Sequence, residues 1–353
     1  MGQLKAIHQI KDLVVFGDYK RPHIHKNWIN IMQQSTSRML DESKVARSYK
    51  VGHTYGNTSL ATSLEVKDTI SKLQPGATGP DGIHNLMLKN LPDSFVELLT
   101  ELFNRSVIES VIPSEWNKAI VIPLLKAGKD PKLVDSYRPI SLTSCVAKLI
   151  ERVIKQRILT PLSDHIQIEQ LGFLPGRSTT DALVRLEHLI KLSFKKRKAV
   201  HVIFLDMDSA FDRVDVGQLI RKLSVMGLPN LLVNWFHQFL MGREVQASLG
   251  GSYSEFKRKA YNIGLPQGSV LSPLLFSVYC HNISLENVLG AELFLYAVAV
   301  AVVGRDPLCL QSASQKAVDT LSIWANSNNM VFSTHKSVCC STKCIAWLLS
   351  NHR

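Results

Sequence analysis

Apolar residues recur at helical spacing in several stretches of the chain, and these stretches have recognisable ends. In the first, Thr62 and Glu65 have the spacing of a capping box, and Pro75 with Gly76 ends the predicted helix. In the next, Asp93 can cap a helix that carries a periodic apolar stripe. We also expect helices at 141–158, 179–194, 216–227, 230–242 and 309–326, and one directly after the segment 264–273.

Other stretches are short and rich in β-branched residues, which is typical of strands. We predict a buried strand at 118–126, followed by a polar loop at 127–139. A strand at 199–207 delivers Asp206 to its end, a hairpin across 243–264 turns at Gly250-Gly251, and a last strand lies near 330–333. Strands and helices mix without a regular βα alternation, so the pattern favours an α+β fold over a doubly wound sheet.

Eleven consecutive apolar residues, Leu293 to Val303, interrupt this ordinary pattern. A membrane-spanning helix needs roughly 20 such residues, so this run is too short to cross a bilayer as a helix. We therefore interpret it as a core strand or hairpin, and we expect no membrane partner.

The charge of the chain points to a different kind of partner. Of its 353 residues, 41 are Lys or Arg and 29 are Asp or Glu, which gives a net charge of +12. Such an excess favours a polyanion, most commonly nucleic acid, although a merely soluble basic protein would have the same composition.

The six cysteines and the amino terminus bear on the compartment. No two cysteines form a C-x-x-C pair, and no His stands at a zinc spacing beside the last three. The first residues lack the long apolar core of a signal peptide, and the sixth residue is not Ser or Thr, as N-myristoylation would favour. We therefore expect an intracellular protein of the nucleus, the cytoplasm or both, with reduced thiols, that is not secreted.

Two stretches carry candidate chemistry. Asp206, Asp208 and Asp212 lie at a predicted strand end and in the turn after it, where a rigid backbone can present carboxylates to a metal ion; acids at a helix start are the alternative interpretation. The segment 264–273, "GLPQGSVLSP", combines two glycines with Gln267, which permits close backbone approach to a ligand.

Seven stretches, in this order along residues 62–340, identify the chain by resemblance. The chain resembles the reverse transcriptase of non-LTR (LINE-type) retrotransposons of the jockey-like group. The stretches are "GPDGI" (79–83), "SYRPISLTS" (136–144), "QLGFLPGRSTTDAL" (170–183), "FLDMDSAFDRV" (204–214), "GLPQGSVLSP" (264–273), "LFLYAVAVAVVG" (293–304) and "WANSNNMVFSTHKS" (324–337).

The resemblance implies a fold and its division. It implies a right-hand polymerase fold with fingers and a palm, in which an antiparallel sheet packs on helices and the thumb is largely missing. It divides the chain into a poorly defined segment (1–60), fingers and template-binding region (61–198), palm (199–214 and 264–340), an insertion of helices and a hairpin (215–263) and a truncated tail (341–353).

The resemblance also implies roles at the centre of the site. Asp206, with the backbone carbonyl of Met207, would hold catalytic Mg²⁺. Phe211 would be the bulky residue that rejects a 2′-hydroxyl and so favours dNTPs. Gln267 and Gly268 would pack on the incoming nucleotide.

Further from the metal, the resemblance implies contacts with phosphates and with the template. Arg138 would grip the triphosphate, because a guanidinium fork suits that task. Phe173 and Arg177 would lie near the template strand, and Lys336 would protonate the leaving pyrophosphate. The alternatives are plain surface charges for Arg138 and Arg177, a core position for Phe211 and a solvated strand end for Lys336.

The chain departs from the family at one decisive place. After Tyr296 and Ala297 the family has two catalytic aspartates, whereas this chain has Val298 and Ala299. Neither side chain offers an oxygen to Mg²⁺. We therefore expect an RNA-directed DNA polymerase domain, with RNA template, DNA primer and dNTPs as partners, whose catalysis is impaired. The alternatives are a non-catalytic, basic nucleic-acid-binding remnant and an unstable product of a decaying genomic copy; the sequence leaves the oligomeric state open.

Overall fold

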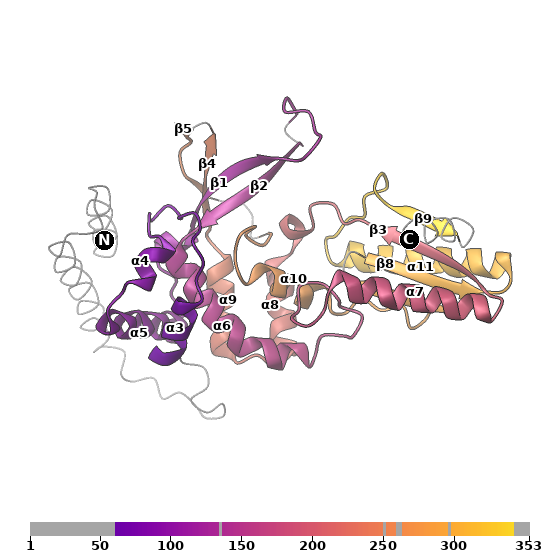
Figure 1. Cartoon of the computed structure of the whole chain (residues 1–353), viewed down its shortest axis with the longest axis horizontal. Coiled ribbons are helices and arrows are strands. Elements are labelled where there is room, and N and C mark those ends of the chain that lie inside the picture. Colours follow the sequence, from indigo (N-terminus) through magenta and orange to yellow (C-terminus); the bar gives the residue numbers. More distant parts are fainter. Residues whose placement is uncertain (1–60, 134–135, 250–251, 259–262, 296–297, 342–353) are drawn as a thin grey trace. The chain divides into compact units, whose positions relative to one another are not determined.

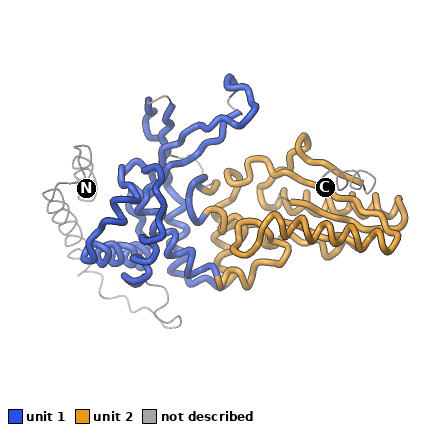
Figure 2. The backbone as a smooth tube through the Cα atoms, in the orientation of Figure 1, with its two compact units in different colours: residues 1–159, 227–262, 266–271 blue, residues 160–226, 263–265, 272–353 orange. Residues whose placement is uncertain are grey.

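The computed structural model describes residues 61–133, 136–249, 252–258, 263–295 and 298–341 (Figure 1). The chain forms two compact units, and neither is one continuous stretch of sequence (Figure 2). Unit 1 comprises Met1–Leu159, Gly227–Asn262 and Pro266–Leu271, and unit 2 comprises Thr160–Met226, Ile263–Leu265 and Ser272–Arg353. Helices and strands mix without βα alternation, so the predicted α+β class is confirmed.

The sequence predicted the N-cap of helix α3 correctly and that of helix α5 wrongly. Helix α3 (Ser63–Ser71) begins with the predicted capping box between Thr62 and Glu65. Helix α5 (Asp93–Glu109) has Pro92 as its N-cap, and Asp93 is its first helical residue, without a side-chain cap hydrogen bond. The carboxylate of Asp93 instead pairs with Lys67 Nζ at 2.7 Å. The described residues of unit 1 also form the helices α4 (Asn85–Lys89), α6 (Cys145–Ser163, in unit 1 as far as Leu159) and α9 (Asn230–Leu240), and the 3₁₀ turn η2 (Ser114–Asn117).

The sheet of unit 1 contains a strand that the sequence pattern did not predict. Strand β1 (Lys118–Leu125) pairs antiparallel with β2 (Tyr137–Thr143) and parallel with β4 (Glu244–Leu249). β2 is an edge strand, and it tolerates Pro139 because a proline on an edge removes no hydrogen bond from the sheet interior. The helix predicted from residue 141 therefore starts only at Cys145.

Burial in this sheet is also less than predicted. Ala119 in β1 is buried, but Leu124 is 56% exposed, so β1 is not the fully buried strand that its apolar run indicated. The predicted hairpin is present, because β4 pairs antiparallel with β5 (Ser252–Tyr253) and β6 (Lys257–Arg258). Its proposed turn, Gly250-Gly251, lies outside the described residues.

Unit 2 is built on an antiparallel sheet in the order β7-β8-β3-β9. Successive residues of a strand face opposite sides, and the two sides of this sheet bury different apolar clusters. One cluster joins the sheet to α11 through Leu310, Ala317 and Leu321, and the other joins it to α7 through Ile190. The strands are β3 (Ala199–Leu205), β7 (Ala291–Leu295), β8 (Val298–Gly304) and β9 (Val338–Ser341), and the two helices are α7 (Thr179–Lys195) and α11 (Pro307–Ser327) (Figure 1).

This sheet explains the eleven-residue apolar run. The run forms β7 and β8, which pair antiparallel with Leu295 opposite Val298, so the predicted core hairpin is confirmed; residues 296–297 lie outside the described part. β8 is covered on both faces, and a strand of that kind is apolar at every position instead of alternating. The helices of the described residues include none that is long and apolar enough to cross a membrane.

The described residues of unit 2 form three further elements. They are the 3₁₀ turn η4 (Ala210–Arg213) and the helices α8 (Val216–Val225) and α10 (Ser272–Cys280), which begin where the pattern predicted helices. The last strand is misplaced in the prediction: at 330–333 there is a single bridge, between Phe332 and Met207, and the strand β9 begins at Val338.

Candidate active site

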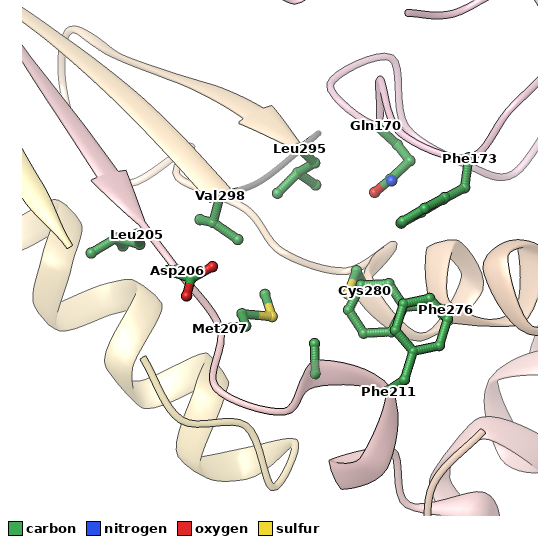
Figure 3. Close-up of a pocket in the computed structure, with 11 residues that line it drawn as sticks. Gln170, Phe173, Leu205, Asp206, Met207, Phe211, Phe276, Cys280, Leu295 and Val298 are labelled. Carbon is green, nitrogen blue, oxygen red and sulfur yellow. The ribbon is translucent and has the colours of Figure 1, made fainter. Parts of the chain in front are cut away.

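Asp206 directly follows β3, the strand that runs between β8 and β9 in the sheet of unit 2. Its side chain is half-exposed and borders a cavity of about 190 Å³ (Figure 3). Among the described residues that line this cavity, Asp206 is the only acid. We call the cavity the Asp206 pocket; its lining residues are Gln170, Phe173, Leu205, Asp206, Met207, Ala210, Phe211, Phe276, Cys280, Leu295 and Val298.

Val298 and Ala299, the two positions at which the resemblance implies aspartates, differ in their surroundings. Val298 is paired with Leu205 and Leu295, is buried, and lines the Asp206 pocket. Ala299 follows on the opposite face of β8, in the apolar cluster that packs on α7. Because side chains alternate along a strand, Val298 is the position that lies at the pocket together with Asp206.

The acids of the predicted metal motif are held by a lysine. Lys336 Nζ lies 3.2 Å from Asp206 Oδ2 and 3.6 Å from Asp208 Oδ1. The two carboxylates raise the pKa of Lys336 above its ordinary value, and Asp206 has the larger effect. The backbone fixes this arrangement, since Ser333 N donates to Asp206 O and Asp208 N donates to Val331 O. Asp212 lies in η4 and does not line the pocket.

The donor set does not fit a pair of Mg²⁺ ions. Mg²⁺ requires near-octahedral oxygen ligation. The pocket offers the carboxylate of Asp206 and the backbone of Met207, while Val298 and Leu295 stand opposite with hydrocarbon only. Nowhere in the described part of the chain do three His, Cys, Asp or Glu side chains converge as a metal site.

Three aromatic rings form one wall of the Asp206 pocket. Phe211 stacks on Phe276 with centroids 5.0 Å apart, and Phe173 meets both rings edge-on at 5.9 and 6.3 Å. Phe173 has a φ of 65°, a conformation that is costly for a bulky residue and that clusters at functional sites. The resemblance implies different roles for Phe173, near the template, and Phe211, near the sugar. In the structure the two rings are in contact, and both also contact Phe276.

The loop before α7 supplies the polar side of the pocket. Gln170 is 4% exposed, and its Nε2 donates to Gly172 O at 3.1 Å. Its Oε1 accepts no hydrogen bond from the described residues. Arg177 Nη1 donates to the carbonyls of Gln167 and Gln170, so its guanidinium holds this loop together.

Unit 1 contains the other nucleotide-binding candidates. Ser141 N donates to Gln267 O at 2.9 Å, which fixes the loop of residues 266–271 against β2. At Gly268, where φ is 125°, a Cβ atom would lie 2.2 Å from Ser141 O, so this approach requires glycine. Arg138 lies in β2 with an exposed side chain, opposite Leu124.

A buried carboxylate holds the same loop from α6. Glu151 is 1% exposed, and its Oε2 accepts hydrogen bonds from Ser269 Oγ, Val270 N and Leu271 N. Burial raises the pKa of Glu151, while these hydrogen bonds and the charge of Arg243 lower it. We call Glu151, Ser269, Val270 and Leu271 the Glu151 clamp.

Sequence reasoning missed Glu151, Gln170 and Phe276. A signal existed for Glu151, since it falls on the buried stripe of α6 beside Ala147, Ile154 and Ile158. A lone acid on an apolar stripe indicates a buried and hydrogen-bonded carboxylate. No periodic pattern marks Gln170 or Phe276. Gln170 forms a bridge with Leu295, and Phe276 packs on Phe173 and Phe211, so these contacts join residues distant in sequence.

Comparisons with known proteins agree with the resemblance. Residues 125–349 match the family described as "Reverse transcriptase (RNA-dependent DNA polymerase)". The RNA-directed DNA polymerase from mobile element jockey of Drosophila melanogaster is 32% identical over 290 residues, which is 79% of this chain and 31% of that protein. The probable RNA-directed DNA polymerase from transposon BS, from the same species, is 31% identical over 73% of this chain and 29% of that protein.

The chain is also similar to a protein of solved structure. Telomerase from Candida tropicalis, in complex with the TWJ fragment of telomeric RNA, has a TM-score of 0.48 and 13% identity, and the match covers 73% of this chain and 48% of that one.

The present chain spans about a third of the length of the curated relatives it matches. From the matched residues and the identity to the jockey protein, the chain belongs to the reverse transcriptase family, and its relatives are non-LTR retrotransposon polymerases.

Proposed function

We propose that the chain is the polymerase region of a non-LTR retrotransposon protein, with fingers at 61–198 and a palm at 199–214 and 264–340. The sheet β7-β8-β3-β9, with Asp206 at the end of β3, supports the palm assignment. The five cysteines of the described part are free thiols, which supports a reducing compartment, the nucleus or the cytoplasm.

The proposed substrates are an RNA template, a DNA primer and dNTPs. Reverse transcriptases bind RNA templates and generally depend on Mg²⁺. A net charge of +12 supports a polyanionic partner for this chain. Arg138 and Gln267 are the proposed contacts for the nucleotide. The ring contact between Phe173 and Phe211 supports a proposed site at which these residues contact the template and the sugar.

We further propose that this chain is catalytically impaired. The observation that carries this proposal is Val298, buried beside Asp206 at a position where the family has a carboxylate. A thousandfold loss of rate corresponds to about 4 kcal/mol of transition-state stabilisation, and the loss of a metal ligand at the reacting centre can remove that much.

Primer extension on an RNA template tests the proposal. The chain as written should extend a DNA primer at least about a thousandfold more slowly than the Val298→Asp, Ala299→Asp variant. Val298→Asp alone should restore more activity than Ala299→Asp alone, because only Val298 lines the Asp206 pocket. Val225→Asp, on an exposed position of α8, is the control for adding a charge. Robust synthesis by the chain as written would contradict the impairment.

A second candidate function is nucleic-acid binding without synthesis, which the net charge favours. An RNA–DNA duplex should then bind with an affinity that falls steeply with salt, whether or not the aspartates are restored. A chain that neither binds the duplex nor extends it after restoration would contradict both candidates.

A further inference from the structure

The Asp206 pocket has the size of a ring system and not of a nucleoside triphosphate. Its volume is about 190 Å³. An apolar cavity of about 150 Å³ in another protein is large enough for benzene, so this pocket has room for one ring or two fused rings.

The walls of the pocket suit a flat, uncharged ligand. Phe211 and Phe276 stack on each other, and Phe173 stands edge-on to both, so aromatic surface is offered in two orientations (Figure 3). Leu295 and Val298 add hydrocarbon to the lining, and Val298 is a position at which the resemblance implies an acid. Burial raises the pKa of the Cys280 thiol to about 12, so this residue of the lining is also neutral.

One buried polar atom at the pocket has no partner among the described residues. The amide of Gln170 points into the pocket (Figure 3). Within the described residues its Nε2 donates to Gly172 O, while its Oε1 accepts no hydrogen bond. A buried oxygen that accepts no hydrogen bond is energetically unfavourable, and an N–H group of a ligand would supply the missing hydrogen bond.

The acid at the pocket is already paired. Lys336 Nζ lies 3.2 Å from Asp206 Oδ2, and the described residues that line the pocket include no second carboxylate to help hold a divalent ion. The pocket is therefore unfavourable for an anionic ligand that binds through a divalent ion. The acceptor that is open to a hydrogen-bond donor of a ligand is Gln170 Oε1.

We propose that the Asp206 pocket binds a neutral one- or two-ring heteroaromatic molecule that carries an N–H donor, with no divalent ion, through stacking on the Phe173, Phe211 and Phe276 rings and a hydrogen bond to Gln170 Oε1. This binding goes beyond the proposed function, because it requires neither nucleic acid nor polymerisation. It takes place in the pocket that Asp206 and Phe211 line, so a nucleotide bound there would compete with it.

The test uses two probes of nearly the same shape, 5-fluoroindole and 5-fluorobenzofuran, observed by ¹⁹F NMR with the full chain and no added metal. The first has the N–H donor, and the second replaces it with an oxygen that would face Gln170 Oε1. 5-Fluoroindole should bind saturably and about tenfold more tightly than 5-fluorobenzofuran.

Two variants locate the site, each with a matched control. Gln170→Leu should abolish the difference between the probes, whereas Gln167→Leu, a neighbouring glutamine that bonds Ile283 O and does not line the pocket, should keep it. If Gln170→Leu does not fold, Phe276→Leu decides, because it should weaken both probes at least fivefold. Phe194→Leu, at an exposed position of α7, is the control and should leave the affinity for both probes unchanged.

Three results would overturn the proposal. They are no saturable binding of 5-fluoroindole, equal affinity of the two probes for the unmodified chain, and displacement of 5-fluoroindole by dATP with Mg²⁺ at lower concentrations than by unlabelled indole. Nucleic-acid binding and primer extension are measured separately, so failure here is distinguishable from failure of the proposed function.

Discussion

The Glu151 clamp and the Asp206 pocket each support a segment with a proposed role in nucleotide binding, but only the clamp has its polar groups matched. In the clamp one buried carboxylate accepts three hydrogen bonds from the loop that follows Gln267. In the pocket Asp206 faces hydrocarbon at Val298, and Gln170 Oε1 has no partner among the described residues. Under the proposed function, the loop that would position a nucleotide is well supported, whereas the proposed metal site keeps Asp206 but has the hydrocarbon side chain of Val298.

The largest expected effect comes from breaking the clamp. Glu151→Leu removes the acceptor for Ser269 Oγ and two backbone N–H groups and leaves the charge of Arg243 buried. We expect a loss of about 3–5 kcal/mol in the free energy of unfolding, measured by urea denaturation. Glu97→Ala, at an exposed position of α5, is the control and should change stability little. Equal effects of the two changes would show that the clamp is not a structural requirement.

A smaller effect should follow from crowding the loop that the clamp holds. Gly268→Ala places a methyl group 2.2 Å from Ser141 O at a φ of 125°, and we expect about 2–3 kcal/mol of destabilisation. Gly128→Ala adds a methyl group at a positive φ with nothing within 4 Å, so it isolates the backbone strain. If both variants lose the same stability in urea denaturation, the close approach to β2 contributes nothing.

The smallest effect tests whether a buried lysine on α8 has its hydrogen bonds satisfied as completely as the carboxylate of the Glu151 clamp. Lys222 Nζ on α8 donates to Tyr279 O, Asn282 Oδ1 and Asn328 Oδ1, and burial lowers the pKa of Lys222 from 10.5 to about 8. Above pH 8 the folded chain therefore holds fewer protons here than the unfolded chain, and folding becomes more favourable as the pH rises.

The stability of the unmodified chain, relative to Lys222→Met, should increase by about 1 kcal/mol between pH 7.5 and 9, as measured by urea denaturation at each pH. Subtracting the result for Lys222→Met removes the titration of Cys280 and Tyr279 from the comparison. Burial raises the pKa of both residues to about 12, but both chains contain them. A difference that does not vary with pH would contradict the lowered pKa of Lys222.

Local patterns predicted much of the scaffold. The capping box at Thr62 marked the start of α3, and the continuous apolar run beginning at Leu293 gave the β7–β8 hairpin, because both signals depend on neighbours in sequence. Strand β2 was missed because Pro139 and polar residues resemble a loop until the pairing with β1 is known. Asp93 was misassigned because Pro92 occupies the N-cap.

The site was predictable only where it follows a strand. The apolar run that ends at Asp206 located the acid, and the resemblance located Val298 and Ala299. The assignment of these two positions to opposite faces required the register of β8, and the contact of Phe173 with Phe211 required the folded chain. Long-range contacts of this kind leave no periodic signal in the sequence.

Binding of Mn²⁺, followed by electron paramagnetic resonance in the absence of nucleic acid, tests most directly whether the Asp206 pocket has lost its metal site. The chain as written should show no stoichiometric Mn²⁺ at millimolar concentrations, whereas Val298→Asp, Ala299→Asp should bind Mn²⁺ in a way that Asp206→Asn abolishes. Stoichiometric Mn²⁺ in the chain as written, lost on Asp206→Asn, would contradict the account.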